Sequence, residues 1–200
     1  MYNYRKITKE EREKIIEYRR QRGQPLHSPP HWDLGISDKY LITAACYEHK
    51  HIIGKHPARL TECESEVLSV CREFAQEIFA WCILPNHYHI LVRAESLKVL
   101  TKELGRFHGR TSFQWNGEDE ERGRTVWYRC FDRAIRSERH FWASVNYVHN
   151  NPVHHGYVGK WTDWLWSSAS DFINQAGREK ALRIWLDYPI LAYGKDWDVY

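Results

Sequence analysis

The segment of residues 79–93 places the tightest constraint on how this chain can fold. It contains two apolar runs separated by Pro85-Asn86, a pair typical of tight turns. Runs of this length and composition predict two buried strands joined as a hairpin. The second run carries His87 and His89, and residues two apart on a strand lie on the same face. The two imidazoles are therefore expected to point the same way, which suits a metal ion but does not establish one.

The patterns on both sides of this hairpin predict the other strands and helices. Further strands are expected at residues 40–47 and 126–131. Pro152 is expected to end the last helix, because the residue before a proline avoids helical geometry. The helices are expected at about 61–78, 97–114 and 137–150, with N-terminal caps at Thr61, Ser96 and Ser137.

The resulting order of strand, helix, strand, strand, helix, strand predicts an α+β fold. It is the order of a ferredoxin-like (RRM-like) antiparallel sheet that carries two helices on one face. The helix at 137–150 is additional and can lie over the open face, which bears His87 and His89. Two hundred residues favour one such domain. We expect a catalytic domain at 39–158, a charged helix and connector at 1–38, and a Trp-rich C-terminal extension at 159–200.

Composition and charge bear on the partners and the cellular location of the protein. The formal net charge is +3, which neither requires nor excludes a nucleic-acid partner. No apolar run reaches the ~18 residues that suggest a membrane span, and the N-terminus has no apolar signal-peptide core. The five cysteines are odd in number and form no CxxC pair, which predicts buried free thiols and a cytoplasmic location.

Two segments concentrate positive charge. A cluster at residues 49–56 has loose spacing and is expected to be a solvated basic loop. A ridge along the helix at 97–114 is either a solvated face or a surface that binds a polyanion, and the sequence leaves both open. Its basic side chains recur every four residues: Lys98, Lys102, Arg106 and Arg110.

The helix at 137–150 leads into the groups that would complete a site. Tyr147 and Asn151 are four residues apart and project from the same ridge. If this helix covers His87 and His89, then two imidazoles, an amide oxygen and a phenol converge. Such mixed nitrogen and oxygen ligands suit Mg²⁺ or Mn²⁺ and leave positions open for phosphate oxygens. Beside a polarised phosphate, the phenol could attack to form a covalent phosphotyrosine.

Each of these features also has a structural explanation. A histidine pair on a strand is more often packed than bound to metal, and a Tyr and an Asn near a helix end more often pack and cap. His140 and Ser144 lie near Tyr147 but are not expected to be catalytic. The aromatic residues Trp161, Trp164 and Trp166 are expected to be core residues rather than base-stacking surfaces.

Taken in their order and spacing, the motifs resemble a known family. His87-Tyr88-His89 resembles the HUH motif (His, hydrophobic, His) of single-tyrosine endonucleases. Residues 147–158 resemble the Tyr–Asn-Pro-Val–Gly block of REP-associated tyrosine transposases, which are domesticated relatives of bacterial single-strand insertion-sequence transposases. The resemblance covers residues 40–172 and includes Phe131-Asp-Arg-Ala-Ile-Arg136 and Trp164-Leu-Trp-Ser-Ser168.

The resemblance implies a ferredoxin-like domain that binds single-stranded DNA beside a hairpin. It implies that Tyr147 is the nucleophile, which forms a 5′-phosphotyrosine and frees a 3′-OH, and that His87, His89 and Asn151 hold the metal. Insertion-sequence relatives often carry Gln at the position of Asn151, so Asn favours the REP-associated group, whose members tend to act as monomers. The long charged extension at 1–38 departs from the family pattern, so the family's N-terminal DNA contacts are not carried over.

The favoured hypothesis is a metal-dependent single-strand DNA endonuclease and strand transferase of the tyrosine transposase type. Contacts with DNA are expected from the basic ridge and from Arg133 and Arg136. Two alternatives stay open. One is a non-catalytic nucleic-acid-binding module on the same fold, and the other is a metal-dependent hydrolase of small phosphoesters. The target DNA, the physiological metal and the general base are not determined by the sequence.

Overall fold

The structure is a computed structural model that describes Thr8, Glu10, Glu13, Lys14, Glu17, Gln21, residues 37–191 and Tyr193. Of the helix expected from Lys9 to about Arg22, the described residues Glu10, Glu13, Lys14, Glu17 and Gln21 are helical, and most of the connector after it lies outside the described residues. Within the described part of the chain, no helix is long and apolar enough to cross a membrane. The five cysteines are free thiols, and burial raises the pKa of Cys46 and Cys71 to about 12.

Four antiparallel strands form the sheet, and their spatial order is β2-β3-β1-β4. Helix α3 (Pro57–Phe74) connects β1 to β2, and helix α4 (Leu97–Glu118) connects β3 to β4. This order is that of a ferredoxin-like sheet, so the predicted α+β fold is confirmed. The strands are β1 (Lys39–Cys46), β2 (Glu77–Ile83), β3 (His87–Arg93) and β4 (Trp127–Ala134).

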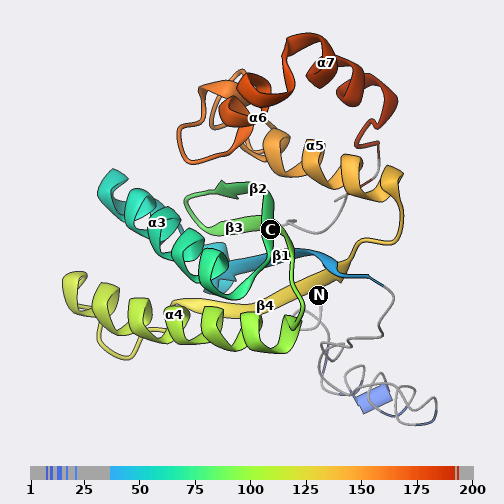
Figure 1. Cartoon of the computed structure of the whole chain (residues 1–200). Coiled ribbons are helices and arrows are strands. Elements are labelled where there is room, and N and C mark those ends of the chain that lie inside the picture. The colour runs from blue at the N-terminus through green and yellow to red at the C-terminus, as the bar shows by residue number, and fades with distance from the viewer. Residues whose placement is uncertain are drawn as a thin grey trace.

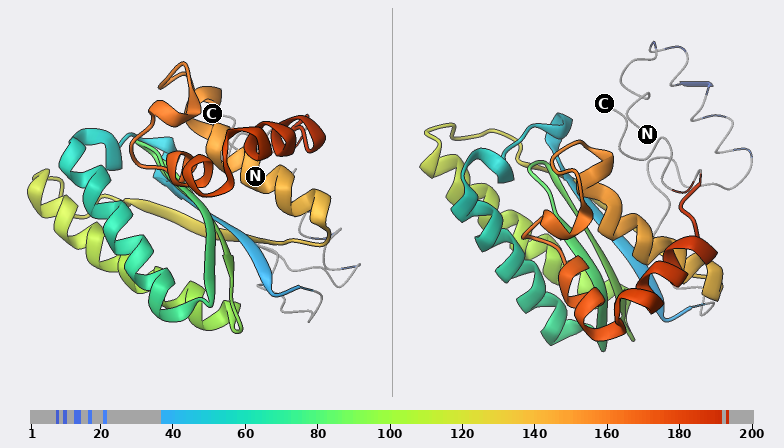
Figure 2. Two further views of the ribbon diagram at one scale, coloured as in Figure 1. Left: turned by 45° about the horizontal axis from the view of Figure 1, so that its top comes forward. Right: turned by 90° about the horizontal axis from the view of Figure 1, so that it is seen from above.

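The sheet separates two layers of helices (Figures 1 and 2). Helices α3 and α4 lie on one face and bury the larger apolar core, which includes Tyr88 and Ile90 of β3. Helix α5 (Glu138–His154) lies over β2 and β3 on the other face, where Leu91 belongs to a second core. Because side chains alternate along β3, His87 and His89 lie on the α5 side. The additional helix therefore covers the face that carries the histidines.

Helix α3 begins and ends earlier than the sequence pattern predicts. It begins at Pro57, and proline is favoured in the first helical turn because its missing N–H would have no partner there. Thr61, the predicted cap, lies inside the helix and donates its hydroxyl to the carbonyl of Pro57 (3.3 Å). Ile78, the predicted helix end, belongs to β2, where it pairs with Val92 of β3. Pairing within the sheet decides this boundary.

Helix α5 also extends beyond its predicted end. It begins after the predicted cap, Ser137, whose Oγ accepts a hydrogen bond from the backbone of His140. It then continues through Pro152 to His154. A proline in the last turn removes only one backbone hydrogen bond, and the N–H of His155 still donates to the carbonyl of Asn151 (3.0 Å).

The segment after α5 covers the outer edge of β2. The Ile83 N–H donates to the Trp166 carbonyl (2.9 Å), and the Ser168 N–H donates to the Trp81 carbonyl (3.1 Å). These bonds satisfy backbone groups that an edge strand would otherwise leave exposed. The remaining elements lie beside α5 in Figure 1: η3 (Trp161–Asp163), α6 (Ala169–Ala176) and α7 (Arg178–Asp187).

The Trp-rich segment packs partly as expected. Trp161 is half-buried, and its ring stacks on the ring of His149 (centroids 5.6 Å apart) and on that of Trp185 (6.1 Å). His149 is buried on α5, and its Nε2 lies 2.9 Å from Ser168 Oγ. Burial lowers the pKa of His149 to about 3, so this ring is neutral and structural.

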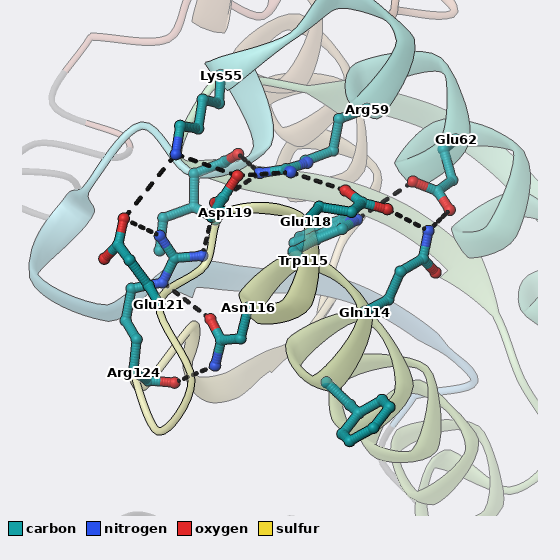
Figure 3. Close-up of polar contacts among 12 residues, drawn as sticks. Lys55, Arg59, Glu62, Gln114, Trp115, Asn116, Glu118, Asp119, Glu121 and Arg124 are labelled. Carbon is teal, nitrogen blue, oxygen red and sulfur yellow. Dashed lines mark hydrogen bonds and ion pairs between the residues drawn. The ribbon is translucent and has the colours of Figure 1, made fainter.

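The charged loop after α4 is tied to the domain by a cluster of ion pairs (Figure 3). Asp119 is at its centre, with a side chain that is only 2% exposed. It accepts hydrogen bonds from Arg59 (2.9 Å) and Arg124 (2.8 Å) and pairs with Lys55 (3.1 Å). Arg59, itself 3% exposed, also pairs with Glu118 (2.8 Å). The cluster joins α3 and the end of α4 to the short helix η2 (Ile53–Lys55).

The surrounding cations lower the pKa of Asp119. The hydrogen bonds from Arg59 are the largest cause, and Arg124 and Lys55 add to them against the opposing effect of burial. A carboxylate with a lowered pKa in the folded state stabilises the fold above its unfolded pKa of about 3.9. This contribution is lost as the pH falls through the folded-state pKa.

Asp119→Asn is expected to lower the free energy of unfolding by about 3 kcal/mol at neutral pH, because it leaves the buried Arg59 guanidinium without its main counter-charge. Urea denaturation measures the loss, which should shrink as the pH falls below about 4, because the Asp119 carboxylate is then protonated in the unfolded wild type and the folded state loses its advantage as the pH approaches the lowered folded-state pKa. Glu121→Gln is the matched control, since that carboxylate is 52% exposed and its removal should cost less than about 1 kcal/mol. Equal losses for the two variants would contradict a special role for Asp119.

Candidate active site

His87 and His89 are fully buried, each 0% exposed, on the α5 side of a central strand. The residues that pair with His89 on the two neighbouring strands are Thr43 of β1 and Cys82 of β2. A buried imidazole needs partners for its ring nitrogens. Here one nitrogen of each ring is held by the sheet and its turn, and the other faces α5.

Asn86 and Thr43 hold the two Nδ1 atoms. His87 Nδ1 lies 2.7 Å from Asn86 Oδ1, and His89 Nδ1 lies 2.7 Å from Thr43 Oγ1. The Asn86 amide is oriented by its own Nδ2, which donates to the carbonyl of His49 (3.1 Å). Because Asn86 Oδ1 can only accept, His87 carries its proton on Nδ1 and presents a lone pair at Nε2.

Helix α5 presents Tyr147 and Asn151 to the two Nε2 atoms. Asn151 Oδ1 lies 3.1 Å from His87 Nε2, and the Tyr147 hydroxyl lies 3.4 Å from His89 Nε2. Asn151 is 1% exposed and Tyr147 is 4% exposed. The four residues that the sequence singles out as nucleophile and metal ligands thus meet within one chain. Their chemical roles stay predictions.

The 3.1 Å contact between His87 and Asn151 has the spacing of two ligands of one cation, and it is also the length of a hydrogen bond that a reversed Asn151 amide would donate to His87. His87 Nε2 and Asn151 Oδ1 are both acceptors, and Asn151 Nδ2 has no hydrogen-bond partner among the described residues. Neighbouring ligands of an octahedral Mg²⁺ ion, with bonds of about 2.1 Å, lie about 3 Å apart. Nowhere in residues 37–191 do three or more His, Cys, Asp or Glu side chains form a metal-binding group. A metal ion here would therefore depend on two imidazoles and an amide oxygen.

A second tyrosine, Tyr193, packs edge-to-face against Tyr147, with ring centroids 5.6 Å apart. Its hydroxyl lies 2.5 Å from Ser144 Oγ and 3.0 Å from His140 Nε2. Because the Ser144 hydroxyl donates to the His140 carbonyl (2.7 Å), Ser144 Oγ accepts from Tyr193. His140 and Ser144 therefore hold Tyr193 on α5, and the expectation that they are not catalytic stays a prediction.

Arg133 belongs to β4, the edge strand on the far side of β1 from β3, and lies on the same face of the sheet as the site. It lies directly across from Leu41 and so shares the α5 side of the sheet. Its side chain is exposed, yet partial desolvation lowers its pKa, while the phenol groups of Tyr193 and Tyr147 act in the opposite direction. Arg136 is exposed, and its backbone N–H donates to His140 Nδ1 (3.2 Å). A role for either arginine in binding DNA stays a prediction.

The basic ridge of α4 lies in the other helix layer and is not part of this site (Figure 1). Two of its four charges are already paired. Arg106 pairs with Glu103 (2.8 Å), and Arg110 pairs with a glutamate of α3, Glu66. Lys98 and Lys102 form no ion pair with any described residue, so only half of the ridge carries uncompensated charge.

The loop at residues 49–56 is only in part the solvated basic loop that its composition predicts, since Lys50, His51, Lys55 and His56 are exposed whereas His49 is buried. His49 is 8% exposed, and its ring centroid lies 6.5 Å from that of His87. The Gly54 N–H donates to the Pro85 carbonyl (2.8 Å), and a Cβ atom at Gly54 would lie 2.4 Å from Pro85 Cβ. This close approach requires glycine. It lets the loop brace the turn that leads into His87.

The sequence analysis missed Thr43 and Asn86. Asn86 directly precedes His87, and histidines that bind metal usually bond through their second nitrogen to a polar group. That rule could have singled out Asn86. Thr43 is opposite His89 only because of the register between β1 and β3, which no local pattern reveals.

The fold and the site together define a class of protein. A ferredoxin-like sheet with a His-x-His strand, covered by a helix that bears Tyr and Asn one turn apart, is the arrangement expected of single-tyrosine HUH endonucleases. Residues 39–151 match the model of the family described as "Transposase IS200 like". The match spans more than half of the chain, and the chain belongs to this family.

Two bacterial proteins of known sequence are similar to this chain. A Haemophilus influenzae protein, provisionally named REP-associated tyrosine transposase, is 29% identical over 119 residues, which cover 54% of this chain and 68% of the relative. The REP-associated tyrosine transposase of Escherichia coli is 27% identical over 108 residues, covering 51% of this chain and 59% of that protein.

A solved structure shares the fold. It is described as a REP-associated tyrosine transposase bound to a REP hairpin, and it superposes with a TM-score of 0.54 at 20% identity. The similarity covers 72% of this chain and 82% of that one. At this identity the likeness supports the ferredoxin-like architecture, and the hairpin is a property of the other protein.

Asn86→Ala is expected to let His87 adopt both neutral tautomers, because the acceptor that keeps the proton on Nδ1 is removed. Long-range ¹H–¹⁵N NMR of the imidazoles should show a protonated Nδ1 in the wild type and a mixture of tautomers in the variant. His108, whose Nε2 bonds to Tyr88 in the other core (3.0 Å), is the internal control and should not change. An unaltered His87 spectrum would mean that Asn86 does not set this tautomer.

Proposed function

We propose that this chain is a metal-dependent endonuclease and strand transferase that cleaves and rejoins single-stranded DNA through Tyr147. The observation that supports it best is the convergence, inside a transposase-family domain, of four groups. The Tyr147 hydroxyl lies 3.4 Å from His89 Nε2, beside the 3.1 Å contact between His87 and Asn151.

In this proposal the Tyr147 oxygen attacks the phosphorus of a DNA phosphodiester. The bond from phosphorus to the 3′-oxygen breaks, the strand end leaves as a 3′-OH, and the phenol gives up its proton. The 5′-phosphate stays bonded to Tyr147 as a phosphotyrosine. This intermediate conserves the bond energy, so a 3′-OH can later attack it and rejoin the strand.

His87, His89 and Asn151 would hold Mg²⁺ or Mn²⁺ in this proposal. Bound there, the ion would polarise the phosphate as a Lewis acid. The facing acceptor atoms of His87 and Asn151 support this reading. The protein's own contribution is orientation, because Asn86 and Thr43 hold the Nδ1 atoms and turn both Nε2 atoms toward α5.

We propose single-stranded DNA beside a hairpin as the substrate and a monomer as the active form. The hairpin rests on the solved relative, which is described as bound to a REP hairpin. The monomer rests on geometry, since β3 and α5 of the same chain contribute all four groups of the candidate site. No second subunit is needed to complete it.

Tyr147→Phe is expected to abolish covalent attachment to DNA and to lower cleavage at least about 10³-fold, because the attacking oxygen is gone. Denaturing gels of labelled hairpin oligonucleotides with randomised flanks detect both the adduct and the cleaved strand. The adjacent Tyr193→Phe is the matched control and should keep the adduct. An adduct that persists in Tyr147→Phe would refute the tyrosine mechanism, and a complete absence of DNA binding by the wild type would favour the alternative of a hydrolase of small phosphoesters.

Asn151→Ala is expected to weaken Mn²⁺ binding at least about 10-fold, because one ligand is lost. Isothermal titration calorimetry on protein stripped with EDTA, without DNA, measures this affinity. Asn150→Ala is the matched control, since it removes a neighbouring, half-buried amide of the same helix. Equal affinities for the wild type and Asn151→Ala would remove Asn151 from the set of ligands.

Replacing Lys98 and Lys102 together with Ala is expected to lower the salt dependence of DNA binding. Each phosphate contact with a single strand contributes about 0.7 to the slope of log affinity against log salt, so the slope should fall by about 1.4. Replacing Arg106 and Arg110 should change it less, because both are paired with glutamates. Fluorescence anisotropy at several salt concentrations gives the slopes, and an unchanged slope in the Lys variant would make α4 a solvated face.

A further inference from the structure

A row of aromatic rings leads from the candidate site toward the protein surface, and the proposed mechanism does not use it. The ring of His155 packs edge-to-face on that of His87, with centroids 5.0 Å apart. Tyr157 follows at 6.1 Å from His155, and Trp164 at 5.4 Å from Tyr157. The exposed His51 flanks the row, since its Nε2 lies 3.3 Å from the Tyr157 hydroxyl.

The backbone at the end of α5 builds this row. Asn151 and His155 are one turn apart, so the row starts on the ridge that carries the candidate ligand. Gly156 then takes a left-handed conformation (φ +72°), which reverses the chain. The Tyr157 N–H donates back to the Pro152 carbonyl (2.9 Å), and this bond returns the Tyr157 ring to the end of the helix beside the site.

Tyr157 and Trp164 differ from the aromatic residues of the main core. Trp115 and Tyr88 are 0% exposed there, whereas Tyr157 and Trp164 are only half-buried. Both pack against the smaller core under α5 and keep part of their surface in solvent. Trp164 is fixed by its Nε1, which donates to the carbonyl of Ile83 (2.8 Å). These rings are held rigidly without being enclosed.

We propose that Tyr157 and Trp164 form a stacking platform for a nucleobase of single-stranded DNA that flanks the cleaved phosphate. A strand whose phosphate reaches Tyr147 must leave the site past neighbouring groups, and the aromatic row begins at His87, within the site. Rigid aromatic rings bind unstacked bases of any sequence through their faces. The proposal rests on the proposed function and adds the subsite that receives a base.

The test compares two DNA probes that carry the same phosphates. One is a dT12 oligonucleotide, and the other is a 12-mer of abasic sites. The full chain is used with Tyr147→Phe, so that no cleavage occurs, and binding is measured by fluorescence anisotropy at one salt concentration. Loss of one stacked base should weaken binding about 5- to 150-fold, so the parent protein should prefer dT12 by at least this factor.

Tyr157→Ala should reduce the preference for dT12 by about 5- to 150-fold, while Tyr157→Phe should keep it. Tyr157→Leu fills the same space against the core without a π face and should behave like Ala, which guards against a folding defect. Phe113→Ala is the matched control, because Phe113 is an exposed aromatic residue (75%) on α4, in the other layer.

The outcomes distinguish a failure of the stacking platform from a failure of the proposed function. An unchanged preference for dT12 in Tyr157→Ala and Tyr157→Leu overturns the platform and leaves the proposed function standing, provided that the Tyr147 adduct forms in the unmodified chain. Absence of both DNA binding and the adduct overturns the proposed function, and the platform with it. An equal loss in Phe113→Ala would overturn the assignment to this row.

Discussion

The burial of two imidazoles on a central strand is the constraint on which the rest of the structure depends. His87 and His89 are removed from water, and the polar atoms of buried rings are costly unless the protein replaces their hydrogen bonds. Thr43 and Asn86 satisfy one nitrogen of each ring. Helix α5 covers the other two nitrogens with the Asn151 amide and the Tyr147 hydroxyl, and it also buries apolar surface. The contacts that make this burial tolerable also bring Tyr147 to the histidines.

The position of His87 depends on an ion-pair cluster in the other part of the domain. Lys55 pairs with the buried Asp119 and belongs to η2, in which the Gly54 N–H bonds to the carbonyl of Pro85. Pro85 precedes Asn86, and Asn86 fixes the tautomer of His87. The charged loop after α4 is therefore connected through η2 to the turn that precedes His87. Gly54 is the tightest point of this path, because any side chain there would displace Pro85.

The family match ends at Asn151, yet much of what surrounds the site comes after it. Residues 166–168 form hydrogen bonds with the edge of β2. Tyr193 packs against the ring of Tyr147, and its hydroxyl bonds to Ser144. The aromatic row from His155 to Trp164 follows the last matched residue. The candidate chemistry thus lies in the matched segment, while part of the surroundings of the candidate site comes from the C-terminal part of this chain.

The sequence by itself determined what local periodicity can encode. It gave the alternation that puts His87 and His89 on one face, the caps Ser96 and Ser137, and the helical spacing of Tyr147 and Asn151. Only the tertiary structure decided which groups meet those side chains. Thr43 lies opposite His89 through strand register, and Asp119 is held by Arg59 from a helix sixty residues earlier. The same holds for the end of α5, where Pro152 is buried and the helix continues through it to His154. These outcomes depend on contacts between residues distant along the chain, whose energies outweigh the local preferences that a pattern can report.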